Sequence, residues 1–330
     1  MSSSIKRKVA LAIVSSVLSL FLFELLLAVF HVSFSAPPLY PGDIEPEYDQ
    51  TTDPLIGWKL PPSAVVSETT DDYSVSYTSN SLGFRATREF DAASTPQPIV
   101  FLGDSYTFGS GVDDGETFVS LLERQLESIP CVNMGIGGFG IDQMWMTLRY
   151  YALPLKPRAV VLSFVRRDLD RSLSAYRLGH IWREKPTFRL ENGSLVPLTG
   201  ANSPSGVRRF LEQHSRVAAL WRKAENSLSE HYPLGYRWRL NRAIFKAIRD
   251  DCTRAGLPLL VVHIPIDRRK PAPVFRREFA EMRIPFVDLT EQLPSDADSL
   301  YYPRDHHLTP AGHRWVAERL HRPLIDCALE

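Results

Sequence analysis

The chain has 330 residues, of which 44% are apolar, so it is long enough to bury the core of a full α/β domain. Its 38 lysine and arginine residues balance 38 aspartate and glutamate residues, and this zero formal charge argues against nucleic acid as a partner. The three cysteines are widely spaced and form no C-x-x-C pair, which indicates neither a disulfide framework nor a zinc site: Cys131, Cys252 and Cys327.

The first predicted element is a transmembrane anchor over residues 9–35. This apolar stretch carries one charge, Glu24, and is long enough to cross a bilayer as a helix. A cleaved signal peptide is the alternative, although its apolar region usually has only about 7 to 15 residues. Basic residues at positions 6–8 predict a cytoplasmic segment 1–8, so the rest of the chain is expected in the periplasm or outside the cell, attached to the inner membrane.

The remainder is predicted to be a linker, 36–72, followed by one domain, 73–330. The linker is rich in proline and acidic residues. In the domain, short apolar runs alternate with segments of helical period, which is the pattern of buried parallel strands joined by helices. An irregular stretch, about 170–230, predicts an insertion over the sheet. The predicted strands are 98–103, 131–135, 159–165, 258–265 and 284–289, and the predicted helices include 116–129, 236–256 and 310–320.

A serine follows the first of these strands in the segment "FLGDSYTFGSG", residues 101–111. Ligands of open parallel sheets bind beyond the carboxyl ends of the strands, which is where Ser105 is expected to lie. The neighbouring glycines allow a tight turn from strand to helix. Ser105 is therefore a candidate nucleophile, and a serine that only caps a helix is the alternative.

The partners that such a nucleophile needs occur late in the chain, in "DHHLTPAGH", residues 305–313. A hydroxyl requires a histidine to take its proton and a carboxylate to orient that histidine. In an extended segment, Asp305 and His307 lie on one side and His306 on the other. His313 falls in the following helix, where a packing role is expected. Adjacent histidines also suit a metal, but no further ligands have recognisable spacing, so no metal or other cofactor is predicted.

Four segments, taken in order, resemble the four sequence blocks of the GDSL/SGNH hydrolases: "FLGDSYTFGSG", "NMGIGGFG", "VVLSFVRRD" and "DHHLTPAGH". The upstream "YTSNSLGFRATREF" resembles a segment that precedes the first block in membrane-anchored bacterial members. The resemblance covers about residues 55–325. It implies a flavodoxin-like, three-layer α/β/α fold with a five-stranded parallel sheet of order 2-1-3-4-5. It also implies hydrolysis or transfer of ester-linked acyl groups.

The resemblance also assigns roles to residues. It implies that Ser105 is the nucleophile, His307 its base and Asp305 the acid that orients the base. The second block implies that the N–H of Gly138, together with that of Ser105, stabilises the oxyanion. Asp104, in the first block, is expected to support the site.

The third block departs from the family at two positions. Where the family has Gly-x-Asn-Asp, this chain has Val165 and Arg167, and only Asp168 agrees, as a further supporting residue. The asparagine normally completes the oxyanion hole, and losing one such donor in other enzymes lowers turnover by about 10²- to 10³-fold. Three interpretations stay open: Arg167 replaces the asparagine as a donor, binds a substrate carboxylate, or points away.

The expected function is that of a serine esterase or O-acyltransferase acting on acyl groups, first of all acetyl groups, of cell-envelope or secreted glycans. Lipid esters are the second choice of substrate. The alternative is a weakly catalytic or non-catalytic carbohydrate-binding subunit of a polysaccharide acetylation assembly, with a membrane acyltransferase as its partner. Its sugar-binding face would be formed by three tryptophans, Trp182, Trp221 and Trp238. The complete serine, histidine and aspartate set favours the enzyme.

Overall fold

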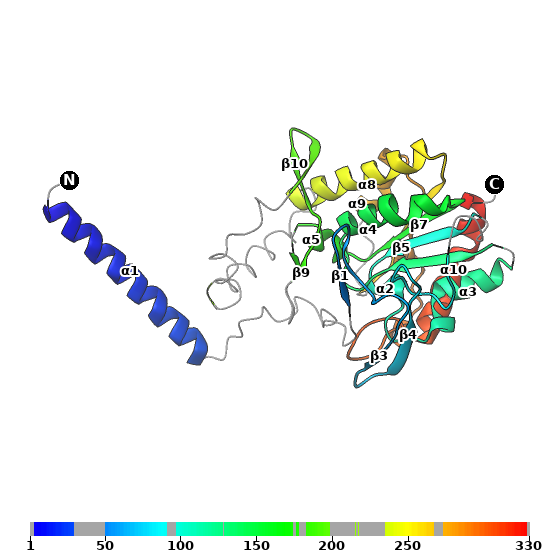
Figure 1. The fold of residues 1–330 in the computed structure, drawn as a ribbon, viewed down its shortest axis with the longest axis horizontal. Coiled ribbons are helices and arrows are strands. Elements are labelled where there is room, and N and C mark those ends of the chain that lie inside the picture. Colours follow the sequence, from blue (N-terminus) through cyan, green and yellow to red (C-terminus); the bar gives the residue numbers. More distant parts are fainter. Residues whose placement is uncertain are drawn as a thin grey trace. The chain divides into compact units, whose positions relative to one another are not determined.

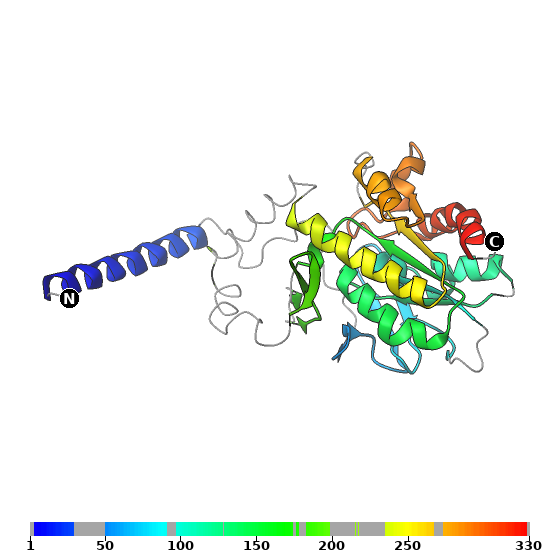
Figure 2. The same ribbon diagram turned by 90° about the horizontal axis from the view of Figure 1, so that it is seen from above.

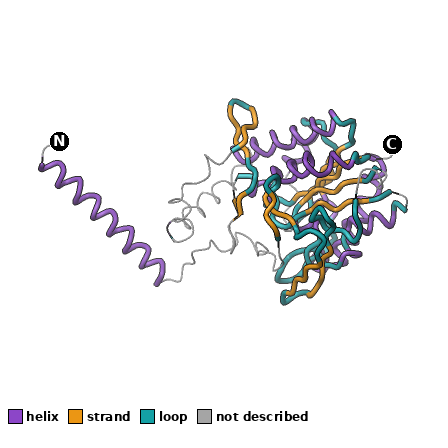
Figure 3. The backbone as a smooth tube through the Cα atoms, viewed as in Figure 1, coloured by secondary structure: helices purple, strands orange, loops and turns teal. Residues whose placement is uncertain are grey.

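The computed structural model describes most of the chain, and Figure 3 draws the remaining residues in grey. The described ranges are 3–29, 50–90, 97–127, 129–173, 176–177, 183–198, 235–266 and 273–328, together with residues 215 and 217. The chain divides into two compact units. One contains residues 1–40 and 202–232, and the other contains residues 41–201 and 233–330.

The first unit contains helix α1 (Ser3–Val29), which covers most of the predicted anchor. Glu24 of this helix accepts hydrogen bonds from the Ser215 hydroxyl and from the Val217 N–H, the latter at 3.1 Å. Across the helices that the structure describes, none combines the length and the apolar character that crossing a bilayer requires. The predicted transmembrane anchor over 9–35 is therefore not supported, and residues 30–35 of it lie outside the described ranges.

The second unit is built on the predicted five-stranded parallel sheet. Each predicted apolar run contains one strand, and the order across the sheet is β13-β12-β7-β5-β6. Read from the β6 edge, with the strands numbered along the chain, this order is 2-1-3-4-5. The predicted sheet and its order are thus confirmed. The strands are β5 (Ile99–Gly103), β6 (Cys131–Gly135), β7 (Ala159–Phe164), β12 (Leu259–His263) and β13 (Phe286–Asp288).

Helices cover both faces of this sheet. Alternate side chains of a strand point to opposite faces, so Val100 and Leu102 of β5 enter one apolar cluster whereas Ile99 and Phe101 enter the other. The first cluster also holds side chains of α4 (Ile141–Thr147), α8 (Tyr236–Arg254) and α9 (Pro273–Glu281). The second holds side chains of α3 (Phe118–Gln125) and α10 (Pro310–Ala328). The three layers can be followed in Figures 1 and 2.

The helices form where the apolar period predicts them. In α8, the buried side chains of Leu240, Ile244 and Ile248 recur every four residues and so form one stripe toward the sheet. The predicted segments 116–129 and 310–320 correspond to α3 and α10. Helix α4 was not predicted, because all of its side chains are buried and its sequence therefore has no polar face.

Two hairpins precede the sheet, and the first three of their four strands lie in the stretch predicted as a linker. They are β1 (Thr51–Asp53) with β2 (Gly57–Lys59), and β3 (Val65–Thr69) with β4 (Ser74–Thr78). Ile56 and Trp58 are fully buried, and the Trp58 indole N–H donates to the Gly137 carbonyl at 2.9 Å. Residues 51–69 are therefore part of the folded domain and not a linker, because they form paired strands and bury Ile56 and Trp58.

The insertion contains two further hairpins in its described part. They are β8 (Tyr176–Arg177) with β9 (Arg183–Glu184), and β10 (Phe188–Glu191) with β11 (Ser194–Pro197). The turn of the second hairpin is Asn192-Gly193, with φ angles of 49° and 82°, as expected for a two-residue turn between antiparallel strands. This part of the irregular stretch is therefore a hairpin, whereas residues 199–214 lie outside the described ranges.

Candidate active site

The candidate nucleophile begins a short helix at the carboxyl end of the central strand. Helix α2 (Ser105–Phe108) follows β5 after a single residue, Asp104. The Asp104 carboxylate accepts a hydrogen bond from the Tyr106 N–H at 3.0 Å and so caps the helix. Ser105 is buried except for a small exposed fraction. The strand-to-helix turn predicted around Ser105 is therefore present, and the capping role falls to Asp104.

The structure brings the three predicted triad residues together. The Ser105 hydroxyl lies 2.8 Å from Nε2 of His307, and Nδ1 of His307 is hydrogen-bonded to Oδ1 of Asp305. A carboxylate only accepts, so Nδ1 carries the proton, which leaves Nε2 as the acceptor of the serine proton. All three side chains are buried. This is the geometry of a serine nucleophile with its base and the acid that orients the base.

The loop that carries the base is a tight turn and not the extended segment that the sequence predicted. His306 has a φ of 67°, and the Asp305 carboxylate also accepts from the backbone N–H of His307 at 3.1 Å. This side-chain-to-backbone bond two residues on is an Asx turn. The His306 carbonyl accepts a hydrogen bond from the Tyr106 hydroxyl at 2.9 Å. The loop is thereby tied to the residue that follows the nucleophile.

Asp305 is held in its ionised form. Burial alone would raise the pKa of this carboxyl, but hydrogen bonds from His307 and from the Tyr73 hydroxyl outweigh it and hold the pKa below its ordinary value. An ionised Asp305 stabilises the positive charge that His307 acquires when it takes a proton. The electrostatics of the pair therefore suit proton transfer from Ser105.

Gly138, the predicted second oxyanion donor, lies in the loop after β6. Its φ is 80°, a conformation that residues with a side chain rarely adopt. The loop is fixed at two points: the Ile136 N–H donates to the Gly103 carbonyl at 3.1 Å, and the Gly137 carbonyl accepts from Trp58. The first bond attaches the Gly138 loop to the end of the strand that presents Ser105.

The two predicted supporting residues are joined by an arginine that the sequence did not single out. Asp168 is fully buried, accepts from the Val165 N–H at 2.9 Å and pairs with Arg171 at 2.6 Å. Arg171 also lies 3.2 Å from Asp104 and donates to the Phe139 carbonyl at 3.4 Å. Burial, and then the charge of Asp104, raise the pKa of Asp168, against the opposing effect of Arg171.

Arg171 therefore links the first three sequence blocks in one polar cluster. No local sequence pattern indicates this role, because it depends on three segments that meet beyond the carboxyl ends of β5, β6 and β7. The cluster fixes the turns that carry Ser105 and Gly138 relative to each other.

The two arginines of the third block act on different groups. Burial raises the pKa of the Tyr106 phenol, and the charge of Arg167 is the largest effect that opposes this rise. The charge of Arg166 instead acts on Asp170, where it lowers the carboxyl pKa against burial. Arg167 is therefore the arginine whose charge reaches the residue next to the nucleophile.

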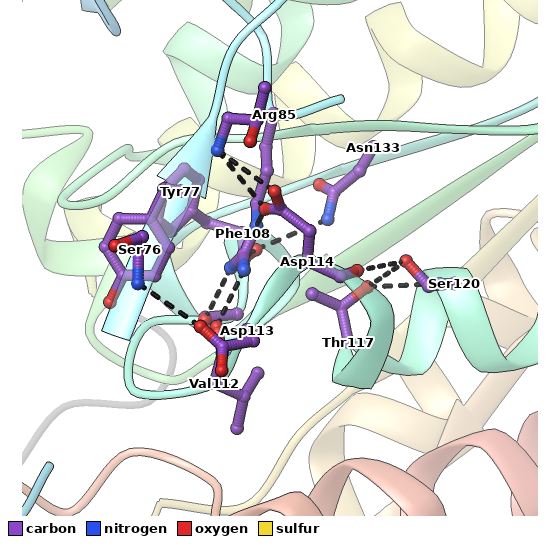
Figure 4. A network of polar contacts seen from close by, with 12 residues as sticks. Ser76, Tyr77, Arg85, Phe108, Val112, Asp113, Asp114, Thr117, Ser120 and Asn133 are labelled. Carbon is purple, nitrogen blue, oxygen red and sulfur yellow. Dashed lines mark hydrogen bonds and ion pairs between the residues drawn. The ribbon is translucent and has the colours of Figure 1, made fainter. Parts of the chain in front are cut away.

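The segment after the nucleophile is held from upstream by Arg85 (Figure 4). This buried arginine donates to the carbonyl oxygens of Phe108 at 3.0 Å, Gly109 at 2.7 Å and Val112 at 2.6 Å. It also forms an ion pair with Asp114 at 2.8 Å. Arg85 belongs to the "YTSNSLGFRATREF" segment, so that segment fixes the backbone that follows Ser105.

Two other predicted residues have structural roles. His313 is fully buried in α10, and its Nδ1 accepts a hydrogen bond from the Phe118 N–H at 3.1 Å, which confirms the packing role. Trp238 is buried and packs 5.4 Å from Phe275, so its placement on a sugar-binding face was wrong. Trp182 and Trp221 lie outside the described residues. Within the described ranges, no group of three or more histidine, cysteine or acidic side chains is arranged to hold a metal.

Comparison with known proteins finds similarity in structure alone. No family model matches the chain, and no curated protein matches it in sequence. A G-D-S-L family lipolytic protein from Desulfitobacterium hafniense DCB-2 is 13% identical, with 69% of this chain and 99% of that chain covered and a TM-score of 0.41. An acetyl xylan esterase, AlAXEase, is 13% identical, with 69% and 100% covered and a TM-score of 0.40.

A third structure, that of TesA, is 14% identical, with 69% of this chain and 98% of that chain covered and a TM-score of 0.43. The first of these three proteins carries the name of the family that the four sequence blocks resemble. At these identities and TM-scores, the similarity decides neither the activity nor the substrate of this chain.

Proposed function

We propose that this protein is a serine hydrolase of the SGNH type that acts on ester bonds. The observation that carries the proposal is the chain of contacts from the Ser105 hydroxyl to Nε2 of His307, at 2.8 Å, and from Nδ1 of the same ring to Asp305. A serine that only caps a helix has no need of either partner. Moreover, the capping bond of α2 is made by Asp104.

In the proposed reaction, His307 takes the hydroxyl proton of Ser105 through Nε2 as the serine oxygen attacks the ester carbonyl. Asp305 stabilises the imidazolium that results. The imidazolium then gives its proton to the alcohol that leaves, and an acyl-serine remains. Water or a sugar hydroxyl, deprotonated by the same ring, releases the acyl group and regenerates the free serine.

The oxyanion is proposed to be held by the backbone N–H groups of Ser105 and Gly138. Ser105 is the first residue of its helix, so its N–H has no acceptor within the helix. The left-handed conformation of Gly138 sets the direction of the second N–H. Arg167 is the proposed third donor in place of the family's asparagine, because it occupies the asparagine's position in the third block and its guanidinium carries five N–H donors.

The proposed substrates are acetyl esters of cell-envelope or secreted glycans. Support for this choice comes from the resemblance of the segment around Arg85 to membrane-anchored bacterial members of the family. Transfer of the acyl group to a sugar differs from hydrolysis only in the second half-reaction. A location on the outer side of the inner membrane and a membrane acyltransferase partner stay predictions.

Hydrolysis of p-nitrophenyl acetate by the full-length protein tests the proposal. We expect Ser105→Ala to abolish the activity. The matched control is Ser163→Ala, which removes a buried hydroxyl that makes no hydrogen bond within the described part of the chain. We expect the control to keep the wild-type rate. Activity that survives in Ser105→Ala would refute the assignment of the nucleophile.

A further inference from the structure

The turn between β3 and β4 packs against the acid of the triad. The Tyr73 hydroxyl donates a hydrogen bond to Oδ2 of Asp305 at 2.8 Å, although 232 positions separate the two residues. Both residues are buried. The other carboxylate oxygen, Oδ1, accepts the bonds from His307. The two oxygens of Asp305 are therefore assigned to different partners, one to the base and one to the upstream hairpin.

The same turn also fixes the backbone that carries Asp305. The Asp72 carboxylate accepts hydrogen bonds from the N–H of Arg304 at 2.9 Å and from the N–H of Asp305 at 2.8 Å. Arg304 in turn pairs with Asp71. The hairpin thus holds the acid at its main chain and at its side chain, and a carboxylate held at both places cannot turn away from its histidine.

The Tyr73 ring is itself fixed in place. It packs against Tyr302 with 5.0 Å between ring centres, and the Tyr302 hydroxyl donates to the Gly111 carbonyl at 2.7 Å. The Gly111 backbone lies so close that an added Cβ there would come within 3.0 Å of the Tyr73 ring. The ring is therefore confined between the loop that carries His307 and the loop that follows Ser105.

Tyr73 is also a permanent donor. Burial, and then the negative charges of Glu68 and Asp305, raise the pKa of its phenol above the ordinary value, so the hydroxyl stays protonated. A protonated phenol bound to a carboxylate favours the ionised form of that carboxylate and lowers its basicity. The bond therefore affects both the orientation of Asp305 and the strength with which it stabilises a protonated His307.

We propose that Tyr73 is a positioning residue of the triad, which orients Asp305 and thereby sets the basicity of His307. This inference rests on the proposed function, because it assigns Tyr73 a role in the same proton transfer. It makes the upstream hairpin a part of the site and not only of the scaffold. The chain of hydrogen bonds in the site then has four members, in the order Tyr73, Asp305, His307 and Ser105.

The test compares Tyr73→Phe with Tyr302→Phe in the full-length protein. Each change removes one hydroxyl from this pair of packed rings, but only the first removes a bond to Asp305. We expect Tyr73→Phe to lower kcat for p-nitrophenyl acetate by about 10-fold with little change in KM, because the lost bond acts on the proton transfer and not on ester binding. In Tyr73→Phe the Asp305 carboxylate loses a donor and becomes more basic, so it stabilises the protonated ring of His307 more strongly. The acid limb of the kcat/KM profile is therefore expected to shift to higher pH.

A second measurement does not depend on activity. The NMR resonance of the His307 Nδ1 proton, which lies in the bond to Asp305, is expected to shift in Tyr73→Phe and to keep its wild-type position in Tyr302→Phe. If Tyr73→Phe matches the control in kcat, in pH profile and in this resonance, the inference is overturned. A failure of the proposed esterase function is distinguishable from this result, because in that case the wild-type protein would not hydrolyse p-nitrophenyl acetate.

Discussion

Replacing Arg85 by methionine removes the group that holds the backbone after the nucleophile. The unbranched methionine side chain fills a similar volume but donates no hydrogen bond. Three carbonyl oxygens, those of Phe108, Gly109 and Val112, lose a charged donor, and Asp114 loses its ion pair. We expect both the free energy of unfolding and the rate of ester hydrolysis to fall.

The magnitude follows from what each carbonyl retains. The Phe108 carbonyl keeps a bond from the Asn133 side chain at 3.4 Å, and the Gly109 carbonyl keeps a bond from the Val112 N–H at 3.3 Å. Hydrogen bonds to charged groups contribute about 1.5 to 3 kcal/mol each, and the retained donors favour the lower end. For the three bonds together we expect a loss of about 4.5 kcal/mol in the free energy of unfolding.

Urea denaturation followed by circular dichroism measures this loss. Arg88→Met is the matched control, because Arg88 lies in the same segment but forms a half-exposed ion pair with Glu123. Such a pair contributes less than about 1 kcal/mol, so the control is expected to unfold near the wild-type midpoint. If Arg85→Met loses no more stability than Arg88→Met, the three carbonyl bonds do not hold the loop and the reasoning is refuted.

Three further variants test two residues of the site and one buried histidine of the core. Asp305→Asn is expected to lower kcat by about 10⁴-fold without unfolding the protein, since an amide neither fixes the His307 tautomer nor stabilises its charge; steady-state kinetics with a rate near wild type would contradict this. Gly138→Ala forces a side chain into a φ of 80°. We expect it to lower the free energy of unfolding by about 1 to 2 kcal/mol. It should also lower turnover by about 10²-fold, as an oxyanion donor is displaced, and wild-type kinetics would exclude that role. His313 is buried, and burial lowers its pKa from the ordinary value of 6.5 to about 3. Between these two pH values the unfolded chain binds a proton at this histidine and the folded protein does not. Stability is therefore lost as pH falls below that ordinary value, by about 2 kcal/mol at pH 5. His313→Gln should remove this part of the pH dependence, and denaturation curves at pH 7 and pH 5 that keep the wild-type difference would contradict it.

The central sheet and the triad could be predicted from the sequence for physical reasons. A parallel strand buried on both faces is a continuous apolar run, so β5, β7 and β12 are visible in the chain itself. The triad was predictable because its chemistry needs a serine after a strand and a histidine close to a carboxylate. The local geometry was not predicted, because Asp305 and His307 meet through a turn at His306 and not along an extended segment. The sequence Asp-His-His does not indicate the φ of 67° that His306 adopts in this turn.

The rest depends on contacts between distant segments. The strands β1, β2 and β3 are short, and the segments that join them contain several prolines, so nothing local distinguishes this stretch from a linker. Tyr73 and Arg171 act through partners that only the folded chain brings near. Trp238 was misassigned because a lone tryptophan on a helix has no pattern that separates a core position from a binding face.

Labelling of the full-length protein with a fluorophosphonate tests the central claim most directly, because this reagent reacts with a serine hydroxyl that a histidine activates. Peptide mapping by mass spectrometry then locates the adduct. We predict one adduct, on Ser105, that is lost in Ser105→Ala and in His307→Ala and retained in Ser163→Ala. A folded wild-type protein that forms no adduct on Ser105 would contradict the claim that this serine is an activated nucleophile.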